Sequence, residues 1–461
     1  MDSDLLATLC RRIVEIGLPI HSLLVLRHGR VAADVTFHPF TGGLHDLASC
    51  TKSVTSTLVG IAIDRGHIAG VDQPVLDLLP GRAAANVDER KRGLTLAHLL
   101  TMSTGLACYA DPGEITLQEM RRSDDWAQFV LDLPMVEEPG ARFEYCSPAT
   151  YLLSVILQEA TGRTALDFAR ESLFGPLGIE EVVWPPSPQG VTTGWGDLHL
   201  TPHDMAKIGA LFLQRGRWDG RRVVSPEWVA AATRKHATPP GRYGYGYGWW
   251  LESPEVYAAI GRGGQQIIVA PALDAVLVLT AGLASEQWAA RDKLIDTHLR
   301  PALRTDVPLS PNPAGVERLR AAAEAARQPR DDPRPPPPIP ALAHDVEGRE
   351  YRLDANDFGL RALSLAHAGE DEARLRISGQ GEWELRIGLD NVPRYTAAGR
   401  IGLRAACRGG WQTGDVFSLD WDEIGSINRW QVSLRFDGDE VTLELAEATG
   451  LGTATIHGRR A

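Results

Sequence analysis

The sequence has few cysteines and no paired cysteine motif. Its five cysteines stand at positions 10, 50, 108, 146 and 407, so no two of them form a C-x-x-C pair and their number is odd. This pattern favours a reducing compartment over a disulfide framework, and it gives no support for a metal cluster. We therefore expect no metal and no cofactor, and we interpret Cys50 and Cys146 as small apolar residues that fill space.

Long apolar runs and an excess of positive charge are also absent. The most apolar segments, such as residues 270–283, are interrupted and shorter than the ~20 residues that cross a bilayer. The formal net charge is −12, and no basic cluster indicates a nucleic-acid partner or a membrane anchor. The opening residues lack the basic and apolar segments of a secretion signal. These absences predict a cytoplasmic protein that acts on a small molecule or a peptide.

The pattern of the first 304 residues predicts one large α+β domain. At 461 residues and 44% hydrophobic, the chain can bury a sizeable core and is long enough for two or three domains. Residues 21–36 indicate a β-hairpin, and the apolar runs at 266–271 and 275–281 indicate late strands of the same antiparallel sheet. Helical spacing marks residues 51–66, 94–104, 126–131, 151–161, 204–216 and about 285–302.

The rest of the chain changes character twice. Residues 305–340 are rich in proline and arginine and end in PRPPPPIP, a composition that favours an extended linker without a core. Residues 341–461 contain alternating runs such as RWQVSLRF and EVTLELAE with turn signals between them. We predict a separate C-terminal all-β domain here, either a small barrel or a sandwich.

Ser49 and Lys52 are the first candidates for catalytic residues. They stand three positions apart at the start of a helical run, so the amine of Lys52 can reach the hydroxyl of Ser49. A lysine whose pKa is lowered by burial can remove the serine proton and activate the nucleophile. No other serine has a lysine three residues after it. An isolated S-x-x-K match, however, more often marks two solvated side chains on an exposed helix.

Tyr145 and Ser147 form the second candidate pair, after a Pro-Gly turn and before the helical run from Tyr151. A phenol beside a lysine can pass a proton between nucleophile and leaving group. A hydroxyl two residues later can hydrogen-bond the lysine or the substrate. The alternative is a tyrosine of the core whose hydroxyl has a structural partner.

Residues 261–265, with the sequence GRGGQ, form the third candidate segment, directly before a predicted strand. Glycines let a strand edge approach a substrate closely, and a backbone N–H there can join that of the serine in an oxyanion hole. Glycines before a strand more often mark only a turn or a bulge. The order of all three signals in one chain therefore carries more weight than any one of them.

Two other features admit more than one interpretation. We interpret His98 as a structural histidine and not as a base. A cluster of aromatic residues either belongs to the core or lines a substrate pocket. Its members are Tyr243, Tyr245, Tyr247, Trp249 and Trp250.

Together these motifs resemble the serine β-lactamase-related family, which includes class C β-lactamases, family VIII esterases, D-aminopeptidases and 6-aminohexanoate-dimer hydrolase. The resemblance spans about residues 10–300. It also rests on the segments LTLAHLLTMSTGL, PGARFEYCSPATYLLSVILQEATG, LFGPLGI and GRGGQQIIVAP. It implies the α+β fold of β-lactamases and penicillin-binding proteins, an antiparallel sheet flanked by helices with an additional helical region, here followed by the C-terminal all-β domain.

The resemblance also implies a role for each candidate residue. Ser49 would be acylated, Lys52 would be its base, and Tyr145 would match the tyrosine of the Tyr-x-Asn motif. Ser147 stands in place of the asparagine of that motif.

The Lys-Thr-Gly motif of β-lactamases falls on Arg262, Gly263 and Gly264, and the N–H of Gln265 would face the oxyanion. Because the lysine and the threonine of that motif are both missing, the carboxylate-binding site of a penicillinase is in doubt.

We expect a serine hydrolase that cleaves a small ester, amide or peptide through an acyl-serine. The Gly-Gly-Gln ending and the MSTGL segment favour the branch of 6-aminohexanoate-dimer hydrolase and the esterases. An acyltransferase would use the same residues, and a product assay with an added acceptor would separate the two. A catalytically silent binding protein is a third hypothesis, against which the joint presence of Ser49, Lys52 and Tyr145 argues.

Overall fold

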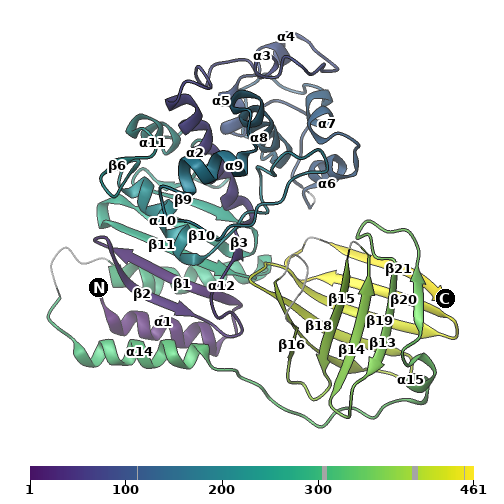
Figure 1. Cartoon of the computed structure of the whole chain (residues 1–461). Helices are drawn as coiled ribbons and strands as arrows, with labels where there is room; N and C mark the ends of the chain where they lie inside the picture. Colours follow the sequence, from purple (N-terminus) through teal and green to yellow (C-terminus); the bar gives the residue numbers. More distant parts are fainter. Residues whose placement is uncertain (112, 304–308, 380, 397–402, 451) are drawn as a thin grey trace. The chain divides into compact units, whose positions relative to one another are not determined.

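Figure 1 shows the structure, a computed structural model that describes residues 1–461 except 112, 304–308, 380, 397–402 and 451. The chain divides into two compact units. The first unit contains residues 1–36, 42–281 and 292–323, and the second contains residues 37–41, 282–291 and 324–461. The predicted domain boundary between residues 304 and 305 lies outside the described residues.

A seven-stranded antiparallel sheet forms one part of the first unit, with the strand order β2-β1-β11-β10-β9-β8-β7. Its first and last strands along the chain, β1 and β11, are neighbours and pair in an antiparallel arrangement. The predicted hairpin and the two predicted late strands are confirmed. The strands are β1 (Ile20–Arg27), β2 (Arg30–Thr36), β7 (Gly244–Tyr245), β8 (Trp250–Ser253), β9 (Val256–Gly261), β10 (Gln265–Ala270) and β11 (Ala275–Ala281).

One face of this sheet packs against α10 (Pro202–Leu213), which contacts β1, β10 and β11. The packing is close because Gly209 has no side chain. A Cβ built at this position would lie 2.5 Å from Val276 and 2.9 Å from Ile267. Two short strand pairs lie outside the large sheet, β3 (His45–Asp46) with β4 (His199–Leu200) and β5 (Arg217–Trp218) with β6 (Arg221–Arg222).

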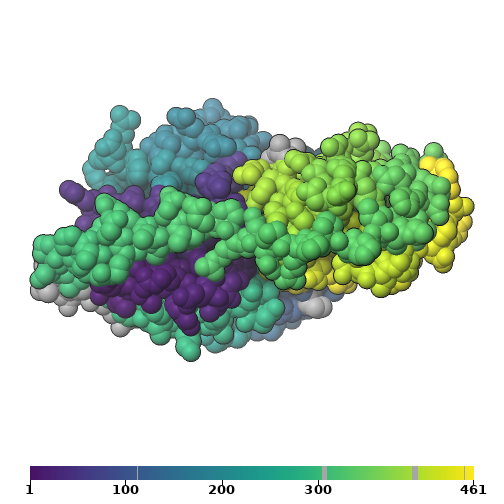
Figure 2. Space-filling view, turned by 90° about the horizontal axis from the view of Figure 1, so that it is seen from below, coloured from purple at the N-terminus to yellow at the C-terminus, as the bar shows by residue number. Residues whose placement is uncertain are grey.

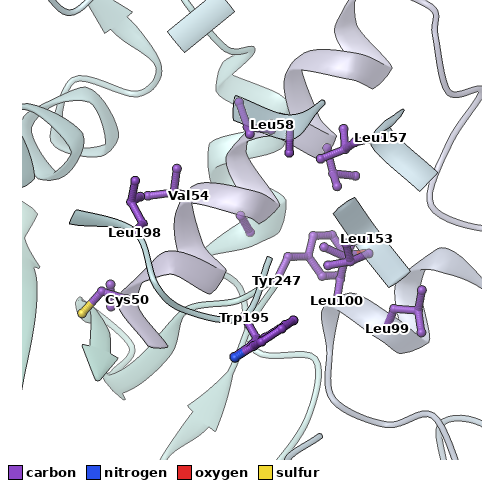
Figure 3. Packing of buried hydrophobic residues seen from close by; sticks show 14 of the residues in the cluster. Cys50, Val54, Leu58, Leu99, Leu100, Leu153, Leu157, Trp195, Leu198 and Tyr247 are labelled. Carbon is purple, nitrogen blue, oxygen red and sulfur yellow. The ribbon is translucent and has the colours of Figure 1, made fainter. Parts of the chain in front are cut away.

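Helix α2 (Thr51–Asp64) runs through the helical part of the first unit. All of its residues from Thr51 to Ala62 are buried, as expected for a helix whose residues, apart from Lys52, are small or apolar on every side. Figure 3 shows its side chains packed with those of α5 (Leu96–Leu100) and α8 (Ser147–Thr161), among them Val54, Leu58, Leu100, Leu153 and Leu157.

The ends of α8 follow from its sequence. The Sγ atom of Cys146 accepts a hydrogen bond from the backbone N–H of Ala149, and Pro148 stands in the first turn. The helix ends at Gly162, which has a φ of 69°. The predicted stop is confirmed, and the helix begins four residues before the predicted start because the cap and the proline extend it.

The remaining helices of the first unit are mostly short. The helix expected over about residues 285–302 is interrupted, since 3-10 and π turns separate its α-helical parts. The helices are α1 (Ser3–Glu15), α3 (Val75–Leu78), α4 (Glu89–Arg92), α6 (Ile115–Arg122), α7 (Trp126–Asp132), α9 (Ala165–Ala169), α11 (Pro226–Ala232) and α13 (Arg300–Leu303), and the turns are η1 (Ala48–Cys50), η2 (Arg170–Phe174), η3 (Arg262–Gly264), η4 (Pro271–Leu273) and η6 (Ile295–Leu299). The turn η5 (Ser285–Gln287) belongs to the second unit, and α12 (Trp288–Leu294) is divided between the two units.

Part of the predicted linker is helical. Helix α14 (Pro313–Arg327) lies beside α1, where Arg318 forms an ion pair of 2.6 Å with Asp4 (Figures 1 and 2). The prediction of extended backbone is wrong for these residues because their alanines, arginines and glutamates are strong helix formers. Residues 328–340, which contain the proline run, form neither helix nor strand.

The second unit contains a ten-stranded sheet that an additional pairing between β15 and β17 closes into a barrel. The predicted all-β character is confirmed, and alternate residues such as Phe417 and Leu419 form its core. A short helix, α15 (Ala341–Val346), precedes the strands. These are β12 (Glu350–Leu353), β13 (Ala362–His367), β14 (Glu372–Ser378), β15 (Glu382–Gly388), β16 (Arg394–Thr396), β17 (Arg404–Trp411), β18 (Val416–Ile424), β19 (Arg429–Asp437), β20 (Glu440–Glu447) and β21 (Thr453–Arg460).

Candidate active site

Ser49 lies in the short turn η1, directly before α2. The turn is sharp because Ala48 adopts a φ of 45°, and the backbone N–H of Ala48 donates to Oδ1 of Asp46 at 2.7 Å. One helical turn later, Nζ of Lys52 donates to Oγ of Ser49 at 2.9 Å. The spacing of three residues therefore brings the predicted nucleophile and its predicted base into direct contact.

Lys52 is held in a buried environment. Only 2% of the residue is exposed, and its ammonium also donates to the carbonyl of Trp195 at 2.9 Å. Burial lowers the pKa of Lys52 from 10.5 to about 8, against the opposing effect of the carboxylates of Glu114 and Asp197. Lys52 therefore loses its proton at a much lower pH than an exposed lysine does, as suits a general base.

Tyr145 stands on the other side of the lysine. Its ring centroid is 4.9 Å from Nζ of Lys52, and the side chain of Ser49 is close enough to oppose the effect of burial on the pKa of Tyr145. Burial raises the pKa of Tyr145 well above its usual value, so the phenol keeps its proton. Trp250 stacks on the Tyr145 ring with an interplanar angle of 19°. The structure therefore brings Ser49, Lys52 and Tyr145 together.

Ser147 contacts Glu114, a residue that no sequence motif indicates. Its Oγ donates to Oε1 of Glu114 at 3.0 Å, and the serine itself is buried at the start of α8. Glu114 precedes α6 and has a raised pKa, chiefly because of burial. No local pattern identifies this glutamate, since its place in the site depends on how the segment before α6 folds back onto α8.

Asp197 is a second carboxylate that the sequence pattern does not reveal. It is partly buried, its backbone has a φ of 63°, and desolvation of its carboxylate raises its pKa. Its charge acts on Lys52. It follows the Gly-Trp-Gly segment of residues 194–196, a turn signal that indicates a bend in the chain but not a role.

The glycine-rich segment lies against the nucleophile. A Cβ built on Gly261 would come within 2.6 Å of the carbonyl of Leu47 and 3.0 Å of the backbone N of Ser49, so only glycine fits there. Gly263 and Gly264 are buried and have φ values of 73° and 93°. The backbone of this turn thus reaches the Ser49 region by conformations that side chains disfavour.

Arg262 and Gln265 occupy different surroundings. The charge of Arg262, which is partly exposed, lowers the pKa of Glu114, so its guanidinium acts on the site. The Gln265 side chain is fully buried and bridges to β11, where Oε1 accepts from the N–H of Ala281 at 3.1 Å. The contribution of the Gln265 N–H to an oxyanion hole stays a prediction.

Cys146 is bonded to Cys108 in a disulfide. The prediction that it only fills space is wrong, and so is the expectation that no disulfide forms. The two cysteines are 38 residues apart, so their proximity depends on the tertiary fold and leaves no local spacing signal. Cys50 is buried, and its pKa is raised by burial, which confirms its interpretation as a packing residue.

The structure assigns the histidine and part of the aromatic cluster. His98 accepts a hydrogen bond from the N–H of Thr95 at the start of α5, which confirms a structural histidine. Tyr247 and Trp249 belong to the hydrophobic core, and Trp250 contacts Tyr145. A pocket lined by the other aromatic residues stays a prediction.

Among the residues that the structure describes, no group of three or more His, Cys, Asp or Glu side chains is placed to hold a metal ion. The same residues contain no helix of the length and apolar character that would cross a bilayer.

A serine that accepts a hydrogen bond from a buried lysine, with a tyrosine ring beside that lysine, at the start of a helix next to an antiparallel sheet, is the arrangement of a serine hydrolase of the β-lactamase type. A family model described as Beta-lactamase matches residues 11–300, and the chain belongs to that family. The resemblance indicated by the motifs is confirmed.

Individual relatives agree with this assignment. The chain is 28% identical to 6-aminohexanoate-dimer hydrolase of Paenarthrobacter ureafaciens, in a match that covers 56% of this chain and 71% of that protein. The octameric penicillin-binding protein homologue of Pyrococcus abyssi matches 100% of both chains with a TM-score of 0.52 and 16% identity. EstCE1, a hydrolase with promiscuous acyltransferase activity, matches 65% of this chain and 98% of its own, with a TM-score of 0.54 and 17% identity. At these identities the solved structures show the fold, and the predicted fold class is confirmed.

Proposed function

We propose that this chain hydrolyses an ester or amide bond through an acyl-enzyme on Ser49, with Lys52 as base and Tyr145 as proton relay. The 2.9 Å hydrogen bond between Nζ of Lys52 and Oγ of Ser49 carries the proposal. The pKa of Lys52, lowered to about 8, supports it because a neutral amine can accept the serine proton.

In the acylation step, the neutral amine of Lys52 takes the proton of Ser49 as Oγ attacks the carbonyl carbon of the substrate. Tyr145 donates its phenolic proton to the leaving group and regains a proton from the Lys52 ammonium. The bond to the leaving group breaks, and an acyl-serine remains. The backbone N–H of Ser49 and one from residues 263–265 are the proposed donors to the oxyanion.

Deacylation reverses the same proton path. A water molecule loses a proton to the Lys52–Tyr145 pair and attacks the acyl carbon, and the pair returns a proton to Oγ of Ser49. The hydrogen bond from Lys52 to the Trp195 carbonyl, at 2.9 Å, holds the amine in one orientation during both steps.

The test of this function is turnover of p-nitrophenyl butyrate by the wild type and by Ser49→Ala. Loss of the hydroxyl should abolish hydrolysis while the circular dichroism spectrum stays unchanged. A variant that hydrolyses the ester as fast as the wild type would show that Ser49 is not the nucleophile.

We further propose that simple esters and small amides are better substrates than penicillins and cephalosporins. A β-lactam presents a carboxylate, which lysine and threonine side chains would hold by charge-assisted hydrogen bonds. Gly263 stands in place of the threonine and supplies no hydroxyl. Arg262 stands in place of the lysine and is the cation of this segment. The relative named a 6-aminohexanoate-dimer hydrolase supports a substrate other than a β-lactam.

Arg262 decides this second proposal, because its planar guanidinium suits a carboxylate. The comparison is kcat/KM for nitrocefin and for a short nitrophenyl ester in the wild type and in Arg262→Ala. We expect the ester to be preferred in both proteins. Efficient nitrocefin turnover that disappears in Arg262→Ala would instead indicate a β-lactamase-like site.

Acyl transfer is the second candidate function. It is favoured by the structural similarity to a hydrolase that is described as having promiscuous acyltransferase activity. The same acyl-serine would then pass to an amine or an alcohol. Product analysis with an added alcohol acceptor separates the two, since a new ester appears only if the acceptor captures the acyl group.

A further inference from the structure

Glu114 is held in an unfavourable backbone conformation beside the catalytic cluster. Its φ and ψ are 60° and 45°, in the left-handed region that residues with a Cβ rarely adopt. Its side chain does not cap α6, because no hydrogen bond joins it to the first turn of that helix. A helix end that keeps such a conformation without a capping bond suggests that the position of the side chain itself is required.

The two carboxylate oxygens of Glu114 have different surroundings. Oε1 accepts the hydrogen bond from Ser147, two residues after Tyr145. Oε2 is buried and has no hydrogen-bond partner among the residues that the structure describes. The second oxygen therefore acts on its neighbours mainly through its charge, which is strong where solvent is excluded.

Charges of both signs act on this carboxylate. Lys52 and Arg262 favour its charged form, whereas burial and the charge of Asp111 oppose it. Glu114 is in turn the first of the carboxylates that favour the ammonium form of Lys52, ahead of Asp197. The ring of Tyr145 also faces the ammonium. Glu114 and Lys52 are thus electrostatic partners across the site.

We infer that Glu114 is a positioning residue for this reaction, which orients the hydroxyl of Ser147 beside Tyr145 and supplies the counter-charge of the Lys52 ammonium. The inference rests on the proposed function, in which Lys52 becomes an ammonium when it takes the proton of Ser49. A fixed negative charge stabilises that ammonium at the moment it forms.

The disulfide supports this role. Cys108 belongs to the segment that leads to Glu114, and Cys146 stands between Tyr145 and Ser147. The covalent bond ties the glutamate-bearing segment to the start of α8. The hydrogen bond between Ser147 and Glu114 spans the same two segments.

The experiment compares Glu114→Gln with the wild type. Glutamine keeps an oxygen that can accept from Ser147 but removes the charge. We would measure the second-order rate of Ser49 labelling by a fluorophosphonate, followed by intact mass, across the pH range in which a lysine with a pKa of about 8 titrates. In a plot of labelling rate against pH, the rate should rise as Lys52 loses its proton and then reach a plateau. Because the charge of Glu114 favours protonated Lys52, its loss should move this rising limb to lower pH by about one unit, and the plateau rate should fall about 10-fold.

Two control variants separate charge from other effects. Glu119→Gln makes the same substitution at an exposed position of α6 and should leave the limb in place. Ser147→Ala removes the hydrogen bond but keeps the carboxylate, so its limb should also stay near that of the wild type. The active fraction in each preparation is fixed by the final extent of labelling, so a partly misfolded variant does not distort the rate.

The outcomes are distinct. A limb that moves to lower pH in Glu114→Gln alone supports the inference. If the wild type is labelled and Glu114→Gln shows the same pH dependence of labelling, the assignment of Glu114 is overturned and the proposed function remains intact. Absence of labelling in the wild type would overturn the proposed function and the role of Glu114 with it.

Discussion

Lys52 donates to the Ser49 hydroxyl and to the Trp195 carbonyl from a position with little contact with water. Few lysines are buried in this way without a specific role. The same burial that disfavours the ammonium makes the neutral amine available as a base. The chemistry and the unusual environment of this residue therefore have one physical cause.

Removal of either proton-transfer group should slow the reaction strongly. We expect Lys52→Ala and Tyr145→Phe each to lower kcat/KM for p-nitrophenyl butyrate by about 10²-fold or more, the usual effect of losing a positioned acid or base. Tyr247→Phe is the matched control, since Tyr247 belongs to the hydrophobic core. Full activity in Tyr145→Phe would make that tyrosine structural.

The pH dependence of acylation follows from the protonation of Lys52. The amine is a base only when neutral, and its pKa is lowered to about 8, so the acylation rate should rise with pH and level off above about 8. The measurement is kcat/KM for the ester as a function of pH. A rate that stays constant through this region would exclude Lys52 as the base.

Gly261 is a residue whose replacement tests the packing of the site. In Gly261→Ala the new Cβ would lie 2.6 Å from the carbonyl of Leu47, so β9 or the turn with Ser49 must move. We expect about a 10²-fold loss of kcat/KM, as for other displacements of about 1 Å in an active site. Gly70→Ala serves as control because nothing lies within 4 Å of its Cβ position. Unchanged activity in Gly261→Ala would show that this contact can relax.

At the level of elements, the disulfide joins the start of α8 to the segment before α6. It closes a loop of 38 residues, which corresponds to a stabilisation of about 4 kcal/mol in the chain-entropy view. This bond is not the pattern expected for a reducing compartment. The cytoplasmic location therefore stays a prediction that the cysteine pairing does not favour.

Thiol titration tests the disulfide. Protein unfolded without reductant should show three thiols, those of Cys10, Cys50 and Cys407. After reduction it should show all five. Reduction should also lower the free energy of unfolding by about 4 kcal/mol. The double variant Cys108→Ser/Cys146→Ser should not respond to reductant. Five thiols in the unreduced protein would show that the bond does not form.

Local sequence patterns predict the helices and strands of this chain better than they predict which distant residues contact one another. The strands and α8 follow from runs of apolar residues and from signals such as Gly162, which act within a few positions. The α14 helix does not stand out in the sequence, because its alanine-rich residues lie next to a proline-rich segment. The disulfide and the contact of Glu114 with Ser147 join segments far apart in sequence, so no local pattern contains them.

At the scale of the whole molecule, the order of the motifs along the chain predicts the catalytic fold. Its sheet is completed only when strands from the beginning and the end of the catalytic region pair with each other. β1 pairs with β11, across more than two hundred residues, and the helical region with Ser49 and Tyr145 is inserted between them. The all-β character of the second unit also follows from alternation in the sequence. Closure into a barrel does not, since it depends on the β15–β17 pairing.

The most direct test of the central claim is the intact mass of the protein after exposure to a fluorophosphonate. The account predicts one covalent adduct on the wild type, located at Ser49 by peptide mapping, and none on Ser49→Ala. Lys52→Ala should label much more slowly than the wild type. An adduct of equal yield on Ser49→Ala, or an unlabelled and folded wild type, would contradict the assignment of this chain as an acyl-serine hydrolase.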